Sequence, residues 1–135
     1  MNGADYRAKN TLPAWYAISV VLVGSAANTG TLILDQDSEF EMWDIFGSST
    51  QDADTDFMPN NFSVMITDQG SGRRLSNIRI PQRNICGPAN GAYRLPMPVI
   101  FPPNANLLFD VLDLSTQAST ATIVLCGYKR FLPVQ

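Results

Sequence analysis

The sequence contains no histidine, so it lacks both the side chain most used for acid–base chemistry near neutral pH and the commonest metal ligand. This absence excludes most hydrolase mechanisms and most zinc sites, and we expect neither enzymatic activity nor a cofactor. Charged residues make up only 16% of the 135 residues and apolar residues 45%, which is too apolar for a disordered chain. Length and composition therefore predict one folded domain with a binding or structural role.

Cysteine and long apolar runs are also scarce. Cys86 and Cys126 form no C-x-x-C motif, and we expect two free thiols, unless the fold brings them within bonding distance. The apolar run 15–23 is shorter than the roughly 20 residues of a membrane-spanning helix. Its position after a few basic residues resembles a signal peptide, but Pro13 and Asp5 disfavour that interpretation. The run is better explained as a buried strand.

Turn residues recur about every 8 to 15 positions along the whole chain, a spacing typical of short strands. Between them the pattern indicates eight strands and no helix. This pattern predicts an all-β fold, a two-sheet antiparallel sandwich, for which the eight-stranded form is the jelly roll. The expected strands are 16–23, 31–34, 39–46, 62–67, 78–80, 93–95, 107–111 and 122–128.

Two of these strands carry further expectations. Both faces of 16–23 are nearly apolar, so we expect that strand to be covered on both sides. In 39–46 the alternation of apolar and acidic residues is interrupted at Trp43 and Ile45, which predicts a β-bulge near that point.

The chain divides into an extended arm, residues 1–14, and a single β-sandwich domain, residues 15–135. The arm is polar around a single aromatic residue, Tyr6, and offers little to bury against its own domain. We therefore expect Tyr6 and Arg7 to contact another molecule.

Acidic residues crowd the first half of the chain. The loop with Asp52, Asp54 and Asp56 does not match an EF-hand, because Phe57 and Ser63 stand where glycine and glutamate are required. A different kind of calcium site on this loop stays open. The favoured interpretation is a solvated acidic loop that contributes to an interface.

Basic residues are segregated from the acidic ones. No lysine or arginine occurs between positions 10 and 72, and a stretch without any acid then holds five arginines. These charges can pair within the monomer or between subunits, where arginine suits bidentate contacts. A nucleic-acid patch is the weaker alternative, since the chain has a net charge of −3. The five candidate interface arginines are Arg73, Arg74, Arg79, Arg83 and Arg94.

A proline-rich connection, 95–104, holds several apolar residues in an extended conformation that we do not expect to join a regular ladder. Such a segment either covers the end of its own sandwich or docks on a neighbour. Met97 and Phe101 are its candidate interface residues.

Several segments resemble a family of small virion proteins of tailed bacteriophages, encoded beside the major capsid protein in many short-tailed phages. The resemblance covers nearly the whole chain. Cys126 stands where such a family usually has a histidine. The segments are Asp37-Ser38-Glu39-Phe40-Glu41, Phe62-Ser63-Val64-x-Ile66-x-Asp68 with Gly70, Pro96-x-Pro98-x-x-Phe101-Pro102-Pro103-Asn104, the strand 107–114, and Ile123-Val124-Leu125-Cys126-Gly127-Tyr128-Lys129-x-Phe131.

The resemblance implies a jelly-roll cement or decoration protein on the exterior of the phage head, assembled in the cytoplasm of the bacterial host. Its expected partners are the major capsid protein and further copies of itself, as a dimer or trimer, without nucleic acid or membrane. A head-to-tail connector or tail subunit is the first alternative. The second is a carbohydrate-binding sandwich, for which Trp15, Trp43, Tyr93 and Tyr128 would supply stacking faces.

Overall fold

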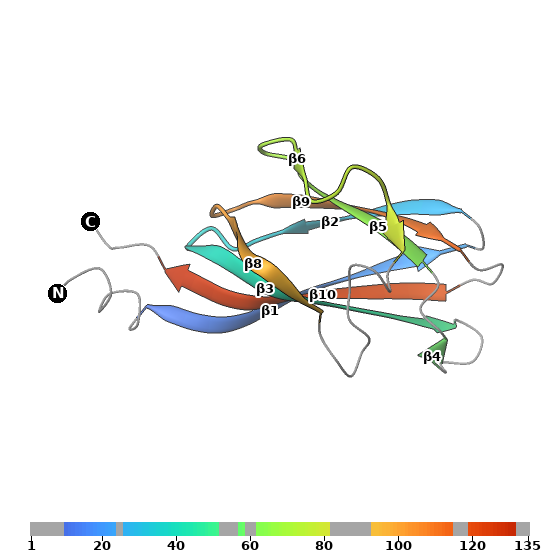
Figure 1. Cartoon of the computed structure of the whole chain (residues 1–135), viewed down its shortest axis with the longest axis horizontal. Helices are drawn as coiled ribbons and strands as arrows, with labels where there is room; N and C mark the ends of the chain where they lie inside the picture. Colours follow the sequence, from blue (N-terminus) through green and yellow to red (C-terminus); the bar gives the residue numbers. More distant parts are fainter. Residues whose placement is uncertain are drawn as a thin grey trace.

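The computed structural model describes residues 10–23, 26–51, 57–58, 62–81, 93–114 and 119–131. These residues form an all-β structure of two antiparallel sheets packed face to face (Figure 1). The strands are β1 (Thr11–Leu22), β2 (Ala27–Ile33), β3 (Ser38–Gln51), β4 (Phe57–Met58), β5 (Phe62–Asp68), β6 (Arg73–Arg74), β7 (Ile80–Pro81), β8 (Tyr93–Phe101), β9 (Asn106–Asp113) and β10 (Ser119–Phe131).

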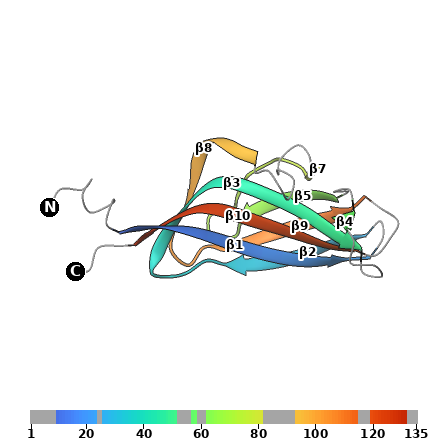
Figure 2. The same cartoon turned by 90° about the horizontal axis from the view of Figure 1, so that it is seen from below.

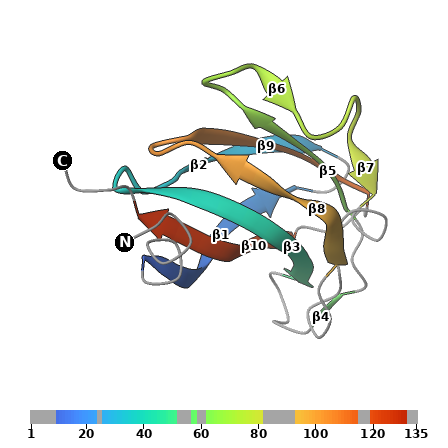
Figure 3. The same ribbon diagram turned by 60° about the vertical axis from the view of Figure 1, so that its left-hand side comes forward.

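Each sheet is four strands wide. One sheet has the order β1-β10-β3, with β4 and β8 on the far edge of β3; the other has the order β2-β9-β5, with β6 and β7 on the far edge of β5. Figure 3 shows β6 and β7 beside β5, and β8 along β3. Counting each shared edge once gives four strand positions in each sheet, β1-β10-β3-β8 and β2-β9-β5-β7, which is the jelly-roll order. The expected sandwich is therefore confirmed, and β4 and β6 are short additions to it.

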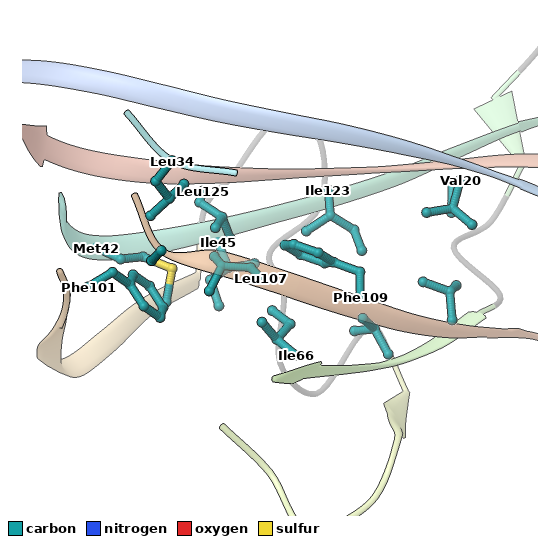
Figure 4. Close-up of a cluster of buried hydrophobic side chains, with 14 of the residues drawn as sticks. Val20, Leu34, Met42, Ile45, Ile66, Phe101, Leu107, Phe109, Ile123 and Leu125 are labelled. Atoms are coloured by element: carbon teal, nitrogen blue, oxygen red, sulfur yellow. The ribbon is translucent and has the colours of Figure 1, made fainter. Parts of the chain in front are cut away.

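The core lies between the two sheets and follows from the alternation of side chains along each strand. Leu107 and Phe109 of β9 face Ile123 and Leu125 of β10, and all four are buried (Figure 4). Burying each such side chain contributes about 1.5 to 3 kcal/mol. This apolar layer fixes which residues of every strand remain on the outside.

The expectation that the first long strand is covered on both faces is wrong. In β1, Val20 and Leu22 are buried, whereas Trp15 and Val21 are exposed, as is Val23 directly after the strand. The reason is topological, because β1 is an edge strand of its sheet and the second sheet covers one face of it only. Its outer face is apolar without being covered.

The bulge expected near Trp43 is present. Cys126 of β10 pairs with Asp44, and the next residue, Gly127, pairs with Met42, so Trp43 is the extra residue. At this point the strands approach so closely that a Cβ on Gly127 would lie 1.8 Å from the backbone oxygen of Glu41. Only glycine fits there.

The proline-rich segment does join a sheet, contrary to expectation. In β8, Arg94 pairs with Asp44, and Val99, Ile100 and Phe101 pair with β3 at the other end of the segment. The prolines at 96 and 98 lie between these paired ends, in the irregular stretch where a missing N–H costs no ladder bond. The segment covers its own core, because Phe101 is only 2% exposed.

The strand boundaries also change the expected arm. β1 begins at Thr11, so residues 11–14, assigned to the arm from the sequence, pair with β10. Residues 1–9, including Tyr6 and Arg7, lie outside the described part of the chain.

Candidate functional site

The outer face of the β1-β10-β3-β8 sheet carries the densest group of aromatic and charged side chains. One cross-strand row runs over all four strands and consists of Trp15, Cys126, Asp44 and Arg94. Tyr128 lies on the same face of β10, two residues after Cys126. The bulge adds Trp43 to this face. We call Trp15, Trp43, Asp44, Arg94 and Tyr128 the outer-face cluster.

Arg94 lies at the β8 end of this row and contacts two members of the outer-face cluster, Asp44 and Trp43. Its Nε and Nη2 donate to the two carboxylate oxygens of Asp44 at 3.1 and 3.2 Å, and its guanidinium lies 5.2 Å from the ring centroid of Trp43. The hydrogen bonds to Asp44 raise the pKa of Arg94 above its ordinary value. The Arg94 side chain is 65% exposed, so this fixed cation still faces solvent.

The neighbouring side chains hold Trp43 in place. Its indole Nε1–H donates to Oε2 of Glu41 at 3.2 Å. Arg130 lies 3.6 Å from Glu41 and 3.9 Å from Glu39. The bulged tryptophan is thus fixed between two ion pairs rather than free to turn.

Two aromatic side chains of the outer-face cluster are open to solvent. Trp15 is 63% exposed and Tyr128 is 40% exposed. Tryptophan, tyrosine and arginine are the residue types that dominate binding energy at protein interfaces. Chemically, this face can bury aromatic surface against a partner and can donate hydrogen bonds from Arg94.

Cys126 lies within the same row and is a free thiol, as expected. Burial and, second, the carboxylate of Asp44 raise the pKa of this thiol. Cys126 therefore stays protonated at neutral pH and is a poor nucleophile. Cys86 lies outside the described residues.

The candidate arginines are not brought together. Arg73 and Arg74 are exposed on β6 of the other sheet. Arg79 lies between β6 and β7, with its Nε 3.1 Å from Asp110 but without a hydrogen bond through that atom. This ion pair lines an open hollow of about 480 Å³ together with Ser63, Met65, Asn77, Ile78 and Leu112. Of the candidate arginines that the structure describes, only Arg94 belongs to the outer-face cluster.

The proline-rich segment contributes one exposed residue and one core residue. Met97 is 71% exposed on β8. Phe101 is a buried core residue, so its assignment to an interface was wrong; the hydrophobic pattern did not show which side of the extended segment faces inward.

The segregated charges pair within the chain in several places. Asp44 binds Arg94, Glu39 and Glu41 lie near Arg130, and Asp35 binds Lys129. The intramolecular alternative thus accounts for part of the pattern. Arg83 and the acidic loop with Asp52, Asp54 and Asp56 lie outside the described residues.

Sequence reasoning missed how the cluster is assembled. As site residues, Trp15, Trp43 and Tyr128 were named only as stacking faces of the carbohydrate-binding alternative, and Arg130 was not noted. The alternation in each strand could have assigned them to outward positions, but their proximity depends on the pairing of β1, β10 and β3, which are distant in sequence. The described residues contain no group of three potential metal ligands and no helix able to span a membrane.

Comparisons with known proteins add little. No protein-family model matches the chain, and no curated protein matches it. Among solved structures, a periplasmic inhibitor of g-type lysozyme from Salmonella Typhimurium is 12% identical, with a TM-score of 0.35 over 88% of this chain and 92% of that chain. Such a similarity assigns neither a family nor a function.

Proposed function

We propose that this protein is a structural virion protein, a cement or decoration subunit that binds and bridges major capsid protein subunits on the exterior of a phage head. The observation that carries the proposal is the outer-face cluster, where exposed Trp15 and Tyr128 lie on the same face of one sheet as the paired cation of Arg94. The jelly-roll order of the strands and the resemblance in sequence support it. The proposal requires no cofactor and no catalytic residue.

The geometry suggests how the attachment works. Trp15 and Tyr128 supply apolar area that a capsid subunit would cover, and both project from paired strands of one sheet. Rigid aromatic side chains lose little conformational entropy on binding. The Arg94–Asp44 pair compensates part of the cost of removing the guanidinium from water, since the carboxylate stays bonded in the complex. The face thus combines apolar contact area from Trp15 and Tyr128 with directional hydrogen bonds from Arg94.

Quantitative mass spectrometry of purified virions tests the proposal. A cement subunit is expected in copies comparable to the major capsid protein. A few copies per particle would instead support a head-to-tail connector or tail subunit, the alternative within the virion. Absence from the virion would contradict both.

One observation favours a second candidate, carbohydrate binding. Trp15 and Tyr128 are exposed on the same face, and exposed aromatic rings stack on sugar rings. Arg94 covers the ring of Trp43, which leaves that side chain less suited to stacking. Tryptophan fluorescence during titration with an oligosaccharide panel tests this candidate: saturable quenching that Trp15→Ser abolishes would support it, and no response to any sugar would contradict it.

A further inference from the structure

The backbone hydrogen bonds of β1 show which of its N–H and C=O groups point away from β10, toward the free edge of the sheet. The backbone N–H of Phe131 on β10 donates to the carbonyl of Asn10, so even-numbered residues in this part of the chain turn toward β10. The carbonyls of Val21 and Val23 accept from Asn28 and Ala26, which lie on the other side. Odd-numbered residues of β1 therefore turn their N–H and C=O groups away from the sheet.

Three residues in the middle of this edge carry unpaired groups. Trp15, Ala17 and Ser19 are exposed, and their outward backbone groups have no partner within the described ranges. Pro13 at one end has no N–H to leave unpaired, and at the other end the side chain of Asn28 donates to the carbonyl of Val21 at 2.8 Å. Each end of the edge is therefore closed at one group, the missing N–H of Pro13 and the occupied carbonyl of Val21, while the centre of the edge is open at every outward group.

The same side of the molecule lacks charge. No charged residue occurs from position 10 to position 34, the segment that forms β1 and β2. Figure 2 shows these two strands side by side along one margin of the sandwich. Natural edge strands are commonly protected by lysine or an inward-pointing charge. Exposed large apolar residues gather here instead: Leu12, Trp15, Val21, Val23 and Ile33.

We propose that β1 pairs antiparallel with β1 of a second copy of this chain, centred on Ala17, so that two sandwiches share one continuous sheet. A charged edge would repel an identical copy, whereas an uncharged edge does not, and this favours a second copy as the occupant. The inference concerns self-association; it shares Trp15 with the proposed capsid-binding face, so it is tested with variants at other positions.

The centre at Ala17 follows from the two closed ends. In that register Trp15 pairs with Ser19 of the second copy, and Pro13 pairs with Val21 of the second copy. Pro13 has no N–H to donate, and the Val21 carbonyl that would need it already accepts from Asn28. The carbonyl of Pro13 in turn accepts from the N–H of Val21. Every outward group between these residues gains a partner.

The side chains fit the same register. Trp15 and Val21 are both exposed at odd-numbered positions on the outer face of β1. Diagonal neighbours across paired strands lie within reach of an aromatic side chain, so Trp15 would lie against Val21 of the second copy. Because both copies use the same surface, the contact is isologous and closes at two subunits. The expected oligomer is a dimer and not a trimer.

Sedimentation equilibrium of the purified full-length chain tests the proposal. Wild type should be a dimer of the 14.8 kDa chain. Ala17→Pro removes one outward N–H without touching the bonds to β10, and should weaken dimerisation at least 100-fold while the unfolding midpoint extrapolated to monomer stays within a few degrees of wild type. Ala17→Ser keeps the N–H and should remain dimeric. A monomeric wild type, or an Ala17→Pro variant as dimeric as wild type, would overturn the proposal.

Charge-swap variants test the register. Ala17→Lys and Ala17→Glu each place like charges opposite each other at the two-fold axis, so each variant alone should be monomeric. Their equimolar mixture should form a dimer, and a mixture that stays monomeric would rule out a centre at Ala17. Tyr128→Ser, on the outer-face cluster, should leave the dimer intact. Loss of dimerisation and loss of capsid binding are therefore separate outcomes.

Discussion

Single residues decide the local geometry where strands pack most closely, and Gly127 is the strictest case. Its Cα lies so near the bulge at Trp43 that any added side chain meets the backbone of Glu41. Backbone atoms cannot rotate aside as a flexible side chain can. Gly127→Ala should therefore destabilise the domain by about 3 kcal/mol or more, measured by chemical denaturation.

Gly70 provides the matched control. A Cβ there would meet only the carboxylate of Asp68, at an ordinary distance of 3.5 Å. Gly70→Ala should change the free energy of unfolding by less than about 0.5 kcal/mol. Equal effects of the two substitutions would show that the close approach at the bulge is not what Gly127 serves.

The thiol of Cys126 gives a second prediction at this scale. Burial and the carboxylate of Asp44 raise its pKa, so the thiolate is scarce near neutral pH. In a Cys86→Ser background, alkylation by iodoacetamide should be slow at pH 7.5 and accelerate above pH 9. Asp44→Asn should increase the rate several-fold, because it removes the negative charge and leaves Arg94 unpaired. A slower reaction in that variant would contradict the account.

At the scale of elements, one polar contact ties β1 and β10 to the turn after β2. The Tyr16 hydroxyl donates to Asp35 at 3.1 Å, Lys129 binds the same carboxylate, and the Tyr16 ring packs edge-on against Phe40. The hydrogen bond from Lys129 lowers the pKa of Asp35 and raises the pKa of Lys129, while burial raises the pKa of Tyr16. The contact links the two sheets, because Tyr16 and Lys129 belong to one sheet and Asp35 follows β2 of the other.

These pKa shifts predict a pH dependence of stability. A lowered pKa at Asp35 stabilises the fold above about pH 3.8, and this contribution is lost as the pH falls further. Raised pKa values at Tyr16 and Lys129 stabilise the fold below about pH 10, and this contribution is lost as the pH rises. Because Asp35 is half-exposed, the whole effect is about 0.5 to 1 kcal/mol.

Asp35→Asn isolates this contribution. Denaturation from pH 2 to pH 7 should show the variant less stable than wild type near neutrality and nearly equal to it at pH 2. Asp37→Asn makes the same change of charge two residues away and should follow the wild-type curve. If the difference between Asp35→Asn and wild type grew toward acid pH, the carboxylate would not be the stabilising form.

Elements differ in how well the sequence predicts them. Alternation identified the positions of β5, β9 and β10, since a half-buried strand records its orientation in every second residue. For β1 the same rule failed, because apolar residues on its outer face indicated burial where the fold leaves an edge. For β8 the prolines argued against a strand, but the residues on either side of them pair with β3. The sequence pattern of a single strand does not show which other strands lie beside it, and those neighbours decide whether β1 is covered and whether β8 is paired.

At the scale of the whole molecule, topology brings together what is distant in sequence. The outer-face cluster draws Trp15, Trp43, Arg94 and Tyr128 from four strands, and their proximity depends on a register that no short segment encodes. The sandwich itself was predictable from strand count and turn spacing. The candidate site was predictable only as a set of residue types, so Arg94 was found among the arginines, while Trp15 and Tyr128 were not recognised as residues of the same sheet face.

The proposed capsid attachment uses one face of the molecule, and binding of the purified protein to capsids that lack it tests this proposal most directly. Trp15→Ser and Tyr128→Ser should each weaken binding at least 10-fold, which corresponds to about 1.4 kcal/mol. Ile78→Ser is the matched control, because Ile78 is 64% exposed, almost the same as Trp15, but lies beside the other sheet. Normal capsid binding by both cluster variants, or equal loss in the control, would contradict the account.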